Sequence, residues 1–263
     1  MPQFAWQGYG VPALATSACP WGMMFAPLSQ SRLDAYAEQF VREGIVRING
    51  MINDDAAASL HSNLRERSDW LQVFNSGDKL FELDRSLRAG LPADKISELD
   101  NAIYAGARTG FQYRYESIRV PDSRSEREAS DDPLQAVAHE LSTGASLEAL
   151  RRITGAPEIE YADAQGTAYS PGDFLTGHDD SFEGKNRRAA YVLSLTPVWR
   201  VEWGGLLIMH GDGEEPARAY MPLMNVMTIF RIGQMHSVSE VTRAAAYRRY
   251  SVTGWLRAEP QPR

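Results

Sequence analysis

The stretch YSPGDFLTGHDDSFEGKNRRAAYVLSL, residues 169–195, places a histidine and two aspartates directly ahead of a charged loop and an apolar run. In an extended chain, residues i and i+2 point to the same side, so His178 and Asp180 are predicted to converge while Asp179 points away. An imidazole and a carboxylate that converge at the end of a strand are typical metal ligands. A metal site here needs a third ligand from elsewhere in the chain.

His236 is the candidate for that ligand, because it begins the later strand-like run HSVSEV. Two imidazoles and one carboxylate form the facial triad of non-haem Fe(II) oxygenases, which leaves three open positions on one side of the metal. His61 and His139 fall in predicted helices without acidic or histidine partners and are interpreted as structural, whereas His210 ends a strand and is ambiguous. An isolated H-x-D also occurs by chance, so the triad needs support from other motifs.

The strand RRYSVTGWLR, residues 248–257, offers a further polar group to the same site. Strand alternation allows only one of Arg248 and Arg249 to face inward, and Ser251 and Thr253 share the face of Arg249. A polar face of this kind is a poor core but suits a polar cosubstrate. A buried guanidinium needs a carboxylate partner, which the far end of a dicarboxylic acid provides. The alternative is that Arg249 is a surface cation.

The order of elements predicts a mostly β fold, a double-stranded β-helix (jelly roll) with N-terminal helices packed on the major sheet. We expect a single domain over 1–263, with an extended arm at 1–28, a helical support with the first strands at 29–157, and the catalytic jelly-roll core at 158–257. Residues 121–133 are charged and lack periodicity, which predicts a long loop. Before residue 158, helices are predicted at 29–44, 53–69, 93–106 and up to about 154, with strands at 45–50, 70–77, 79–84 and 111–120.

Composition limits the classes of function. The chain has 263 residues, 43% of them hydrophobic and 23% charged, and a net charge of −7, which is typical of a globular protein. The acidic balance disfavours nucleic-acid binding and suits either a basic partner or a solvated acidic surface. The only cysteine, Cys19, excludes an intrachain disulfide. No secretory leader and no run of about 18 apolar residues is visible, so we expect a cytoplasmic protein without membrane contact.

Residues 169–255 resemble the catalytic jelly roll of 2-oxoglutarate- and Fe(II)-dependent dioxygenases of the prolyl-hydroxylase type. Within that family, HDDSFEGKNRRAAYVLSL is similar to the corresponding stretch of the eukaryotic ribosomal prolyl hydroxylases. WRVEWGGLLIM is similar to their Trp-rich turn before Gly-Gly, and MPLMNVMTIF to their Pro-x-x-Asn strand before the distal histidine. The second, non-catalytic jelly roll of those eukaryotic enzymes is not part of the resemblance.

The resemblance implies an iron site and the cofactors that go with it. The iron ligands that it implies are His178, Asp180 and His236. Fe(II), 2-oxoglutarate and O2 are the expected cofactors, with ascorbate as a candidate addition. A carboxylate at Asp180 favours hydroxylation, because related halogenating enzymes leave that position to a halide.

The resemblance also implies the cosubstrate contacts. Arg249 is expected to pair with the distal carboxylate of 2-oxoglutarate, with Tyr169 and Leu175 against the same ligand. The chain departs from the family at Ser194, where the family has a tyrosine that touches the cosubstrate. We expect Ser194 to act there as a smaller hydroxyl or through a water, unless another group replaces it. Thr253 joins this set because it shares the face of Arg249.

The expected substrate is a prolyl residue of a protein or peptide, more specifically of a basic ribosomal protein. The loops at 121–133 and 181–188 are expected to line the entrance of the site. Two alternatives stay open: a hydroxylase of a small molecule such as a free amino acid, and a non-catalytic jelly-roll binding module. The intact set of ligands disfavours the binding module. The sequence does not fix the oligomeric state.

Overall fold

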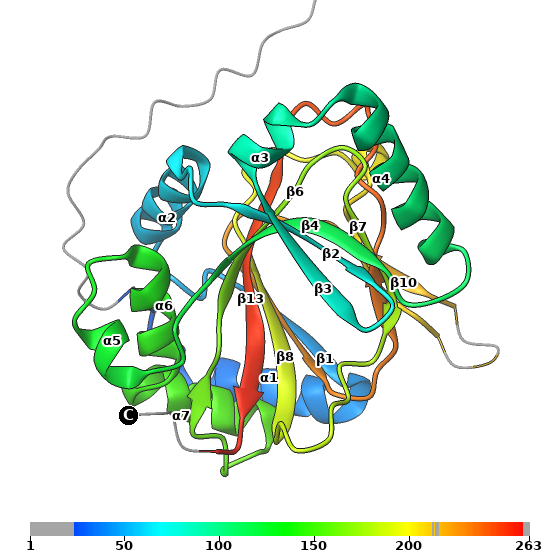
Figure 1. The fold of residues 1–263 in the computed structure, drawn as a ribbon. Coiled ribbons are helices and arrows are strands. Elements are labelled where there is room, and N and C mark those ends of the chain that lie inside the picture. Colours follow the sequence, from blue (N-terminus) through cyan, green and yellow to red (C-terminus); the bar gives the residue numbers. More distant parts are fainter. Residues whose placement is uncertain (1–23, 212, 214–215, 260–263) are drawn as a thin grey trace, which may run out of the picture.

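A computed structural model describes residues 24–211, 213 and 216–259 (Figure 1). Its centre is a curled, antiparallel half-barrel sheet of the double-stranded β-helix type, with helices packed against its outer side. This is the predicted fold class. Within the described part of the chain, no helix combines the length and the apolar character needed to cross a membrane.

Helix α1 begins and ends where its caps predict, whereas α2 ends at Glu66, three residues before the predicted end. α1 (Gln30–Glu43) follows the N-cap Ser29, whose side chain accepts a hydrogen bond from Arg32, and ends before Gly44 at a left-handed φ of 69°. α2 (Asp54–Glu66) carries two aspartates in its first turn, where the helix dipole favours negative charge. The remaining helices are α3 (Arg85–Gly90), α4 (Ala93–Ala107), α5 (Arg124–Glu128), α6 (Pro133–Leu141), α7 (Gly144–Thr154) and the short 3-10 helix η1 (Val201–Trp203).

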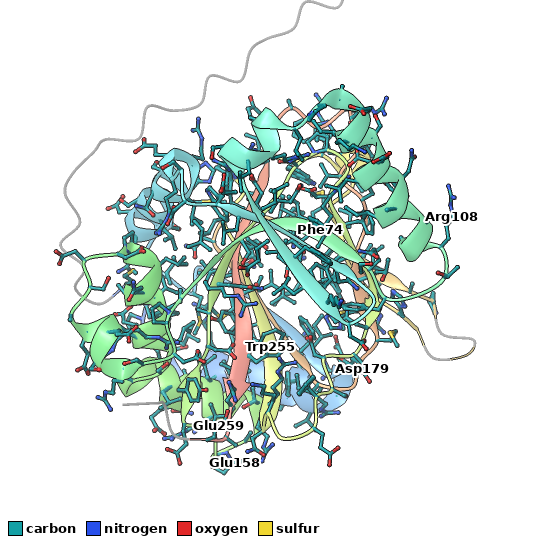
Figure 2. The ribbon with its side chains drawn as sticks, viewed as in Figure 1. Phe74, Arg108, Glu158, Asp179, Trp255 and Glu259 are labelled. Carbon is teal, nitrogen blue, oxygen red and sulfur yellow. The ribbon has the colours of Figure 1, made fainter. Side chains whose placement is uncertain are left out.

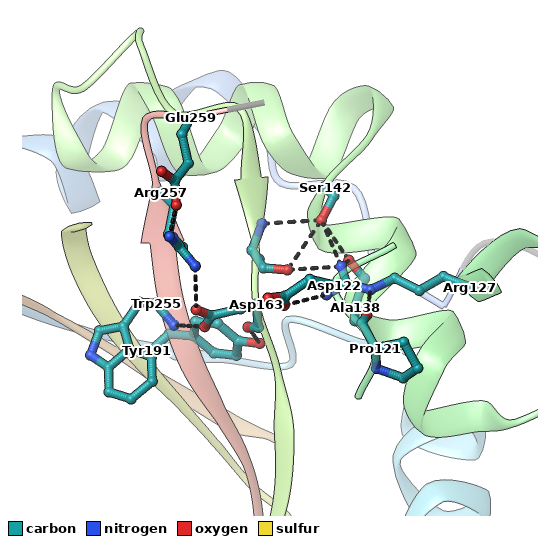
Figure 3. A network of polar contacts seen from close by, with 11 residues as sticks. Pro121, Asp122, Arg127, Ala138, Ser142, Asp163, Tyr191, Trp255, Arg257 and Glu259 are labelled. Carbon is teal, nitrogen blue, oxygen red and sulfur yellow. Dashed lines mark hydrogen bonds and ion pairs between the residues drawn. The ribbon is translucent and has the colours of Figure 1, made fainter. Parts of the chain in front are cut away.

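The segment predicted to be a long loop, residues 121–133, contains helix α5, so that prediction is wrong. Ser123 caps this helix. Arg127 on α5 is only 2% exposed and donates hydrogen bonds to the carbonyl oxygens of Pro121 and Ala162 (Figure 3). A helix of five residues is too short to produce a periodic pattern, and its buried residue is charged, so the sequence resembles that of a solvated loop.

The strands form one continuous network. The larger sheet has the strand order β1-β11-β8-β13-β6-β4. The second sheet has the order β7-β12-β9-β10 and is joined to the first where β7 pairs with β4. The β2–β3 hairpin extends the larger sheet through β4. The bounds are β1 (Ile45–Asn49), β2 (Leu71–Ser76), β3 (Lys79–Asp84), β4 (Tyr113–Arg119), β5 (Tyr161–Ala162), β6 (Gln165–Tyr169), β7 (Phe174–His178), β8 (Arg187–Ser194), β9 (Leu207–Met209), β10 (Arg218–Tyr220), β11 (Val226–Arg231), β12 (His236–Val238) and β13 (Arg249–Arg257).

The main core lies between the helices and the larger sheet. Apolar side chains of α1, α2, α6 and α7 pack against the outer faces of β6, β8, β11 and β13, which confirms the predicted helical support. This packing leaves the opposite, inner face of the sheet free for a site. Of the arm predicted at 1–28, residues 1–23 lie outside the described part, whereas Met24 and Phe25 are buried in this core. The described end of the arm is therefore part of the packed fold.

Candidate metal centre and cosubstrate cavity

Two facing strands and the loop after one of them build the candidate metal centre. His178 is the last residue of β7 and His236 is the first of β12, and the two are paired opposite each other in the antiparallel ladder. The Asp180 carboxylate lies 3.5 Å from His178 Nε2 and 3.4 Å from His236 Nε2. One ligand atom from each residue lies within 4.8 Å of the others. The three predicted iron ligands therefore converge.

Asp180 reaches the histidines by a different route from the predicted one. β7 ends at His178, and Asp180 has a left-handed φ of 61°, so the expected alternation along an extended chain does not apply. Aspartate tolerates this conformation better than most residues. The turn is held in place because Arg187 Nη1 donates to the Asp180 carbonyl at 3.0 Å, and Gly233 N donates to that of Asp179 at 2.9 Å. Figure 2 labels Asp179 on this loop.

Both imidazoles are fixed in the same tautomer. His178 Nδ1 donates to the Thr176 carbonyl at 3.0 Å, and His236 Nδ1 donates to the Gln234 carbonyl at 2.9 Å. A carbonyl only accepts, so each Nδ1 carries a proton, which leaves Nε2 as the nitrogen that faces Asp180 and can bind a metal. Such hydrogen bonds to the second ring nitrogen orient histidines that bind metals.

The surroundings of Asp180 favour the ionised form of its carboxylate, which is the form that binds a cation. Burial alone would raise the pKa of Asp180, but hydrogen bonding to His178 and His236 outweighs it and holds the pKa below its ordinary value. Two neutral nitrogen donors and one ionised carboxylate on one side of an open space suit Fe(II). Among the residues that the structure describes, this is the one group of three or more histidine, cysteine or acidic side chains close enough to share a metal ion.

A cavity of about 680 Å³ opens from the triad along the inner face of the larger sheet. Arg249 is 2% exposed at its inner end, with its guanidinium 4.9 Å from the centre of the Tyr169 ring and no hydrogen bond at Nε. Burial lowers the pKa of Arg249 and raises that of Tyr169. A buried guanidinium with an unused donor fits the distal carboxylate of 2-oxoglutarate. Arg248 points outward and pairs with Glu116 at 3.0 Å, in line with the predicted strand register.

The cavity contains most of the predicted site residues but not all of them. Those that line it are His178, Asp180, His236, Arg249, Tyr169, Leu175 and Thr253. Ser194 is buried on β8 and is not among the lining residues, so its expected contact with the cosubstrate remains a prediction. Of the predicted entrance loops, 121–133 contributes only Asp122, whereas 181–188 contributes Ser181, Phe182, Lys185 and Arg187.

Two lining residues that the sequence does not single out as site residues face each other across neighbouring strands. Arg187 of β8 stacks on Trp255 of β13, with its guanidinium carbon 3.6 Å from the ring centre. We call this pair the Arg187–Trp255 wall. Arg187 Nε and Trp255 Nε1 are buried without a hydrogen-bond partner. Trp255 has the same strand parity as Arg249, which is the sequence signal that indicates its inward direction.

Sequence comparison identifies the family of this core. Residues 164–257 match the sequence model of the 2OG-Fe(II) oxygenase superfamily. The chain is 34% identical over 114 residues to prolyl 3-hydroxylase OGFOD1 of Xenopus laevis, covering 41% of this chain and 22% of that protein. It is 29% identical over 123 residues to prolyl 3-hydroxylase sudestada1 of Drosophila melanogaster, covering 42% and 22%. The chain thus spans about a fifth of the length of these curated relatives.

Solved structures share the fold. A prolyl-4-hydroxylase of Pseudomonas putida aligns with a TM-score of 0.56 at 19% identity, covering 86% of this chain and 98% of that one. A prolyl hydroxylase of Trichoplax adhaerens, in complex with a peptide of hypoxia inducible factor, aligns with a TM-score of 0.56 at 14% identity, covering 87% and 93%. The match over residues 164–257 and the His-Asp-His triad identify this part of the chain as a 2OG-Fe(II) oxygenase core, which implies Fe(II) and 2-oxoglutarate as its cofactors, whereas the solved structures show the fold alone.

Proposed function

We propose that this protein is an Fe(II)- and 2-oxoglutarate-dependent dioxygenase that hydroxylates a prolyl residue in a protein or peptide, more specifically in a basic ribosomal protein. The observation that carries the proposal is the meeting of two features in one cavity. The triad of His178, Asp180 and His236 opens onto the same space as the buried, partly unbonded guanidinium of Arg249. A binding module has no need of both.

Each side chain has a separate task in this mechanism. His178 Nε2, His236 Nε2 and the Asp180 carboxylate hold Fe(II), which with O2 and 2-oxoglutarate supplies the oxidising power for hydroxylation. Arg249 binds the distal carboxylate through its planar fork, and the Tyr169 ring packs against the guanidinium. Leu175 and Val238 line the cavity with apolar surface and exclude water from it.

The Arg187–Trp255 wall supports a prolyl substrate. The indole gives a flat apolar surface for a pyrrolidine ring, and the unpartnered donors Arg187 Nε and Trp255 Nε1 suit the carbonyl oxygens that flank it. At the entrance, Phe111 and Phe182 line the cavity while 49% and 65% exposed, which suits a peptide chain better than a small, fully enclosed metabolite. The names of the curated relatives agree with this substrate class.

The test is direct oxidation of candidate substrates. The protein is incubated with Fe(II), 2-oxoglutarate and ribosomal proteins of its host, and tryptic peptides are searched for a prolyl residue heavier by about 16 Da, one oxygen atom. Asp180→Ala is the control and should give no product while keeping the fold. Oxidation of free proline or another metabolite alone would replace this proposal with the small-molecule alternative. Full activity of Asp180→Ala would remove the triad from the mechanism.

A further inference from the structure

Asp163 occupies an unusual place beside the Arg187–Trp255 wall. It lies between β5 and β6. Both of these strands pair with β13 in one continuous register, which places Asp163 opposite Trp255. Asp163 N donates to the Trp255 carbonyl at 3.1 Å, as a regular ladder requires. The return bond is irregular, because Trp255 N donates to the side-chain oxygen Asp163 Oδ1 at 2.6 Å (Figure 3). A carboxylate thus replaces a backbone acceptor.

The displaced carbonyl of Asp163 has its own partners. It accepts a hydrogen bond from the Tyr191 hydroxyl at 2.8 Å and packs directly against Gly254, where an added Cβ would overlap it. The second carboxylate oxygen, Oδ2, faces Arg257 Nη1 at 3.6 Å, and Arg257 is also paired with Glu259 (Figure 3). The carboxylate of Asp163 therefore has a fixed position between the main chain of β13 and one of its arginines.

The contacts continue from Asp163 to the substrate side of the cavity. The Asp163 carboxylate accepts a hydrogen bond from the backbone N of Trp255, and the Trp255 ring stacks against the Arg187 guanidinium. Arg187 in turn donates to the Asp180 carbonyl at 3.0 Å. We propose that Asp163 is a positioning residue whose carboxylate fixes Trp255, and through it Arg187, and thereby sets the affinity for the substrate residue that packs on this wall. This inference rests on the proposed prolyl substrate.

Three variants separate the parts of this role. D163A removes the acceptor for Trp255 N, whereas D163N keeps an acceptor oxygen but removes the charge beside Arg257. The matched control is E158Q, which breaks the 2.6 Å ion pair between the exposed side chains of Glu158 and Arg188, neither of which lines the cavity. Fe(II)-loaded protein is assayed with a prolyl peptide and with 2-oxoglutarate as separately varied substrates, and amide hydrogen exchange of Trp255 is measured in each variant.

D163A should raise the KM for the peptide about tenfold while the KM for 2-oxoglutarate stays within twofold, because the wall moves but the Arg249 end does not. Exchange of the Trp255 amide should become about tenfold faster, the effect of losing one hydrogen bond. D163N should fall between wild type and D163A in peptide KM and keep the Trp255 amide protected. E158Q should match wild type in both measurements.

Several outcomes would overturn the inference. An unchanged peptide KM in D163A would do so, and so would an equal rise in both KM values, which indicates general damage. If D163A does not fold, D163N decides alone, and a wild-type peptide KM in D163N counts against the role. If wild type oxidises no prolyl peptide, the proposed function fails instead. The Trp255 exchange rates then still show whether Asp163 holds the wall, so the two failures are distinguishable.

Discussion

Arg249 is buried at the start of β13 beside Tyr169, and its Nε has no hydrogen-bond partner. Arg249→Lys should raise the KM for 2-oxoglutarate by about tenfold or more, because a point charge replaces a planar fork that binds a carboxylate with two hydrogen bonds. Affinity for Fe(II), measured by titration, should change much less. The two measurements together distinguish a cosubstrate residue from one that supports the metal.

Arg248 provides the matched control for that prediction. It directly precedes β13, does not line the cavity, and pairs with Glu116 at 3.0 Å. Arg248→Lys should leave the KM for 2-oxoglutarate within about twofold of wild type, because lysine keeps the positive charge beside Glu116 and neither residue lines the cavity. Greater damage from Arg248→Lys than from Arg249→Lys would contradict the assignment of the inward face.

Asp163 also gives a prediction for stability against pH. Burial raises the pKa of Asp163 from 3.8 to about 6, against the hydrogen bond from Trp255 N. The folded state therefore keeps a proton that the unfolded state releases, and the free energy of unfolding falls as pH rises from about 4 to about 6. Above pH 6 the ionised group costs up to about 3 kcal/mol. The charged groups facing this carboxylate are Asp122, Arg187 and Arg257.

Asp163→Asn removes this ionisation but keeps an acceptor for Trp255 N. Its thermal unfolding midpoint should exceed that of wild type by a margin that grows from pH 4 to pH 6 and is then constant. Calorimetry across this pH range measures the margin. A midpoint below wild type at every pH would mean that the negative charge stabilises the fold, and it would contradict the expected sign.

The metal ligands can be predicted from the sequence, but the backbone conformation that brings Asp180 to the two histidines cannot. Two histidines at strand ends and a nearby aspartate indicate the triad, and the surrounding family motifs support it, because ligand types and strand order are visible in sequence. The left-handed turn at Asp180 was not visible, since it depends on anchoring by Arg187 and Gly233 from distant segments. Ser194, placed by the resemblance, is buried on β8 outside the cavity lining, so its contact with the cosubstrate stays a prediction.

Strand β13 connects both ends of the cavity, with Arg249 at its start and Trp255 near its end. Gly254 lies between them, and an added Cβ there would overlap the carbonyl oxygen of Asp163. Gly254→Ala must therefore push β13 away from this segment. We expect a loss of roughly 1–3 kcal/mol in the free energy of unfolding, the usual range for overpacking, measured by urea denaturation. The peptide KM should rise as well, because Trp255 follows directly.

Gly90→Ala is the control for Gly254→Ala. Gly90 ends α3, has no positive φ, and a Cβ there would meet no atom within 4 Å. The change should be neutral or stabilise the protein by up to about 1 kcal/mol, because alanine reduces the freedom of the unfolded chain. Similar losses in both variants would show that the contact at Gly254 relaxes easily.

Elements were predicted best where caps and periodicity agree, as in α1 between Ser29 and Gly44. Helix α5 was missed because a buried arginine takes the place that an apolar residue usually occupies. Arg127 satisfies backbone carbonyls of segments far away in the sequence, including Ala162 beside Asp163. Such a role depends on tertiary neighbours, which a local pattern does not contain. The contact between Arg127 and Ala162 thus joins the helical support to the segment of Asp163, and only the structure reveals it.

At the scale of the whole molecule, charge bears on the choice of substrate. The chain carries a net charge of −7, which attracts a basic protein over long range. The lining of the cavity carries charges of both signs, among them Asp122, Asp163 and Asp179 as well as Arg119, Lys185 and Arg257. The attraction therefore comes from the surface as a whole and not from a local acidic patch. It should act on the encounter of the two proteins more than on the bound complex.

The net charge of the protein predicts a salt dependence of the KM that distinguishes a basic substrate from a neutral one. For a prolyl peptide rich in lysine and arginine, the KM should rise several-fold between about 50 and about 500 mM salt, because the Debye length falls well below the size of the protein. For the same peptide with glutamine at those positions, the KM should start higher and change little. The KM for 2-oxoglutarate serves as the internal control, since the buried pair with Arg249 is screened much less. If both peptides respond equally to salt, the net charge has no part in recognition, and the expectation of a basic ribosomal substrate loses its electrostatic support.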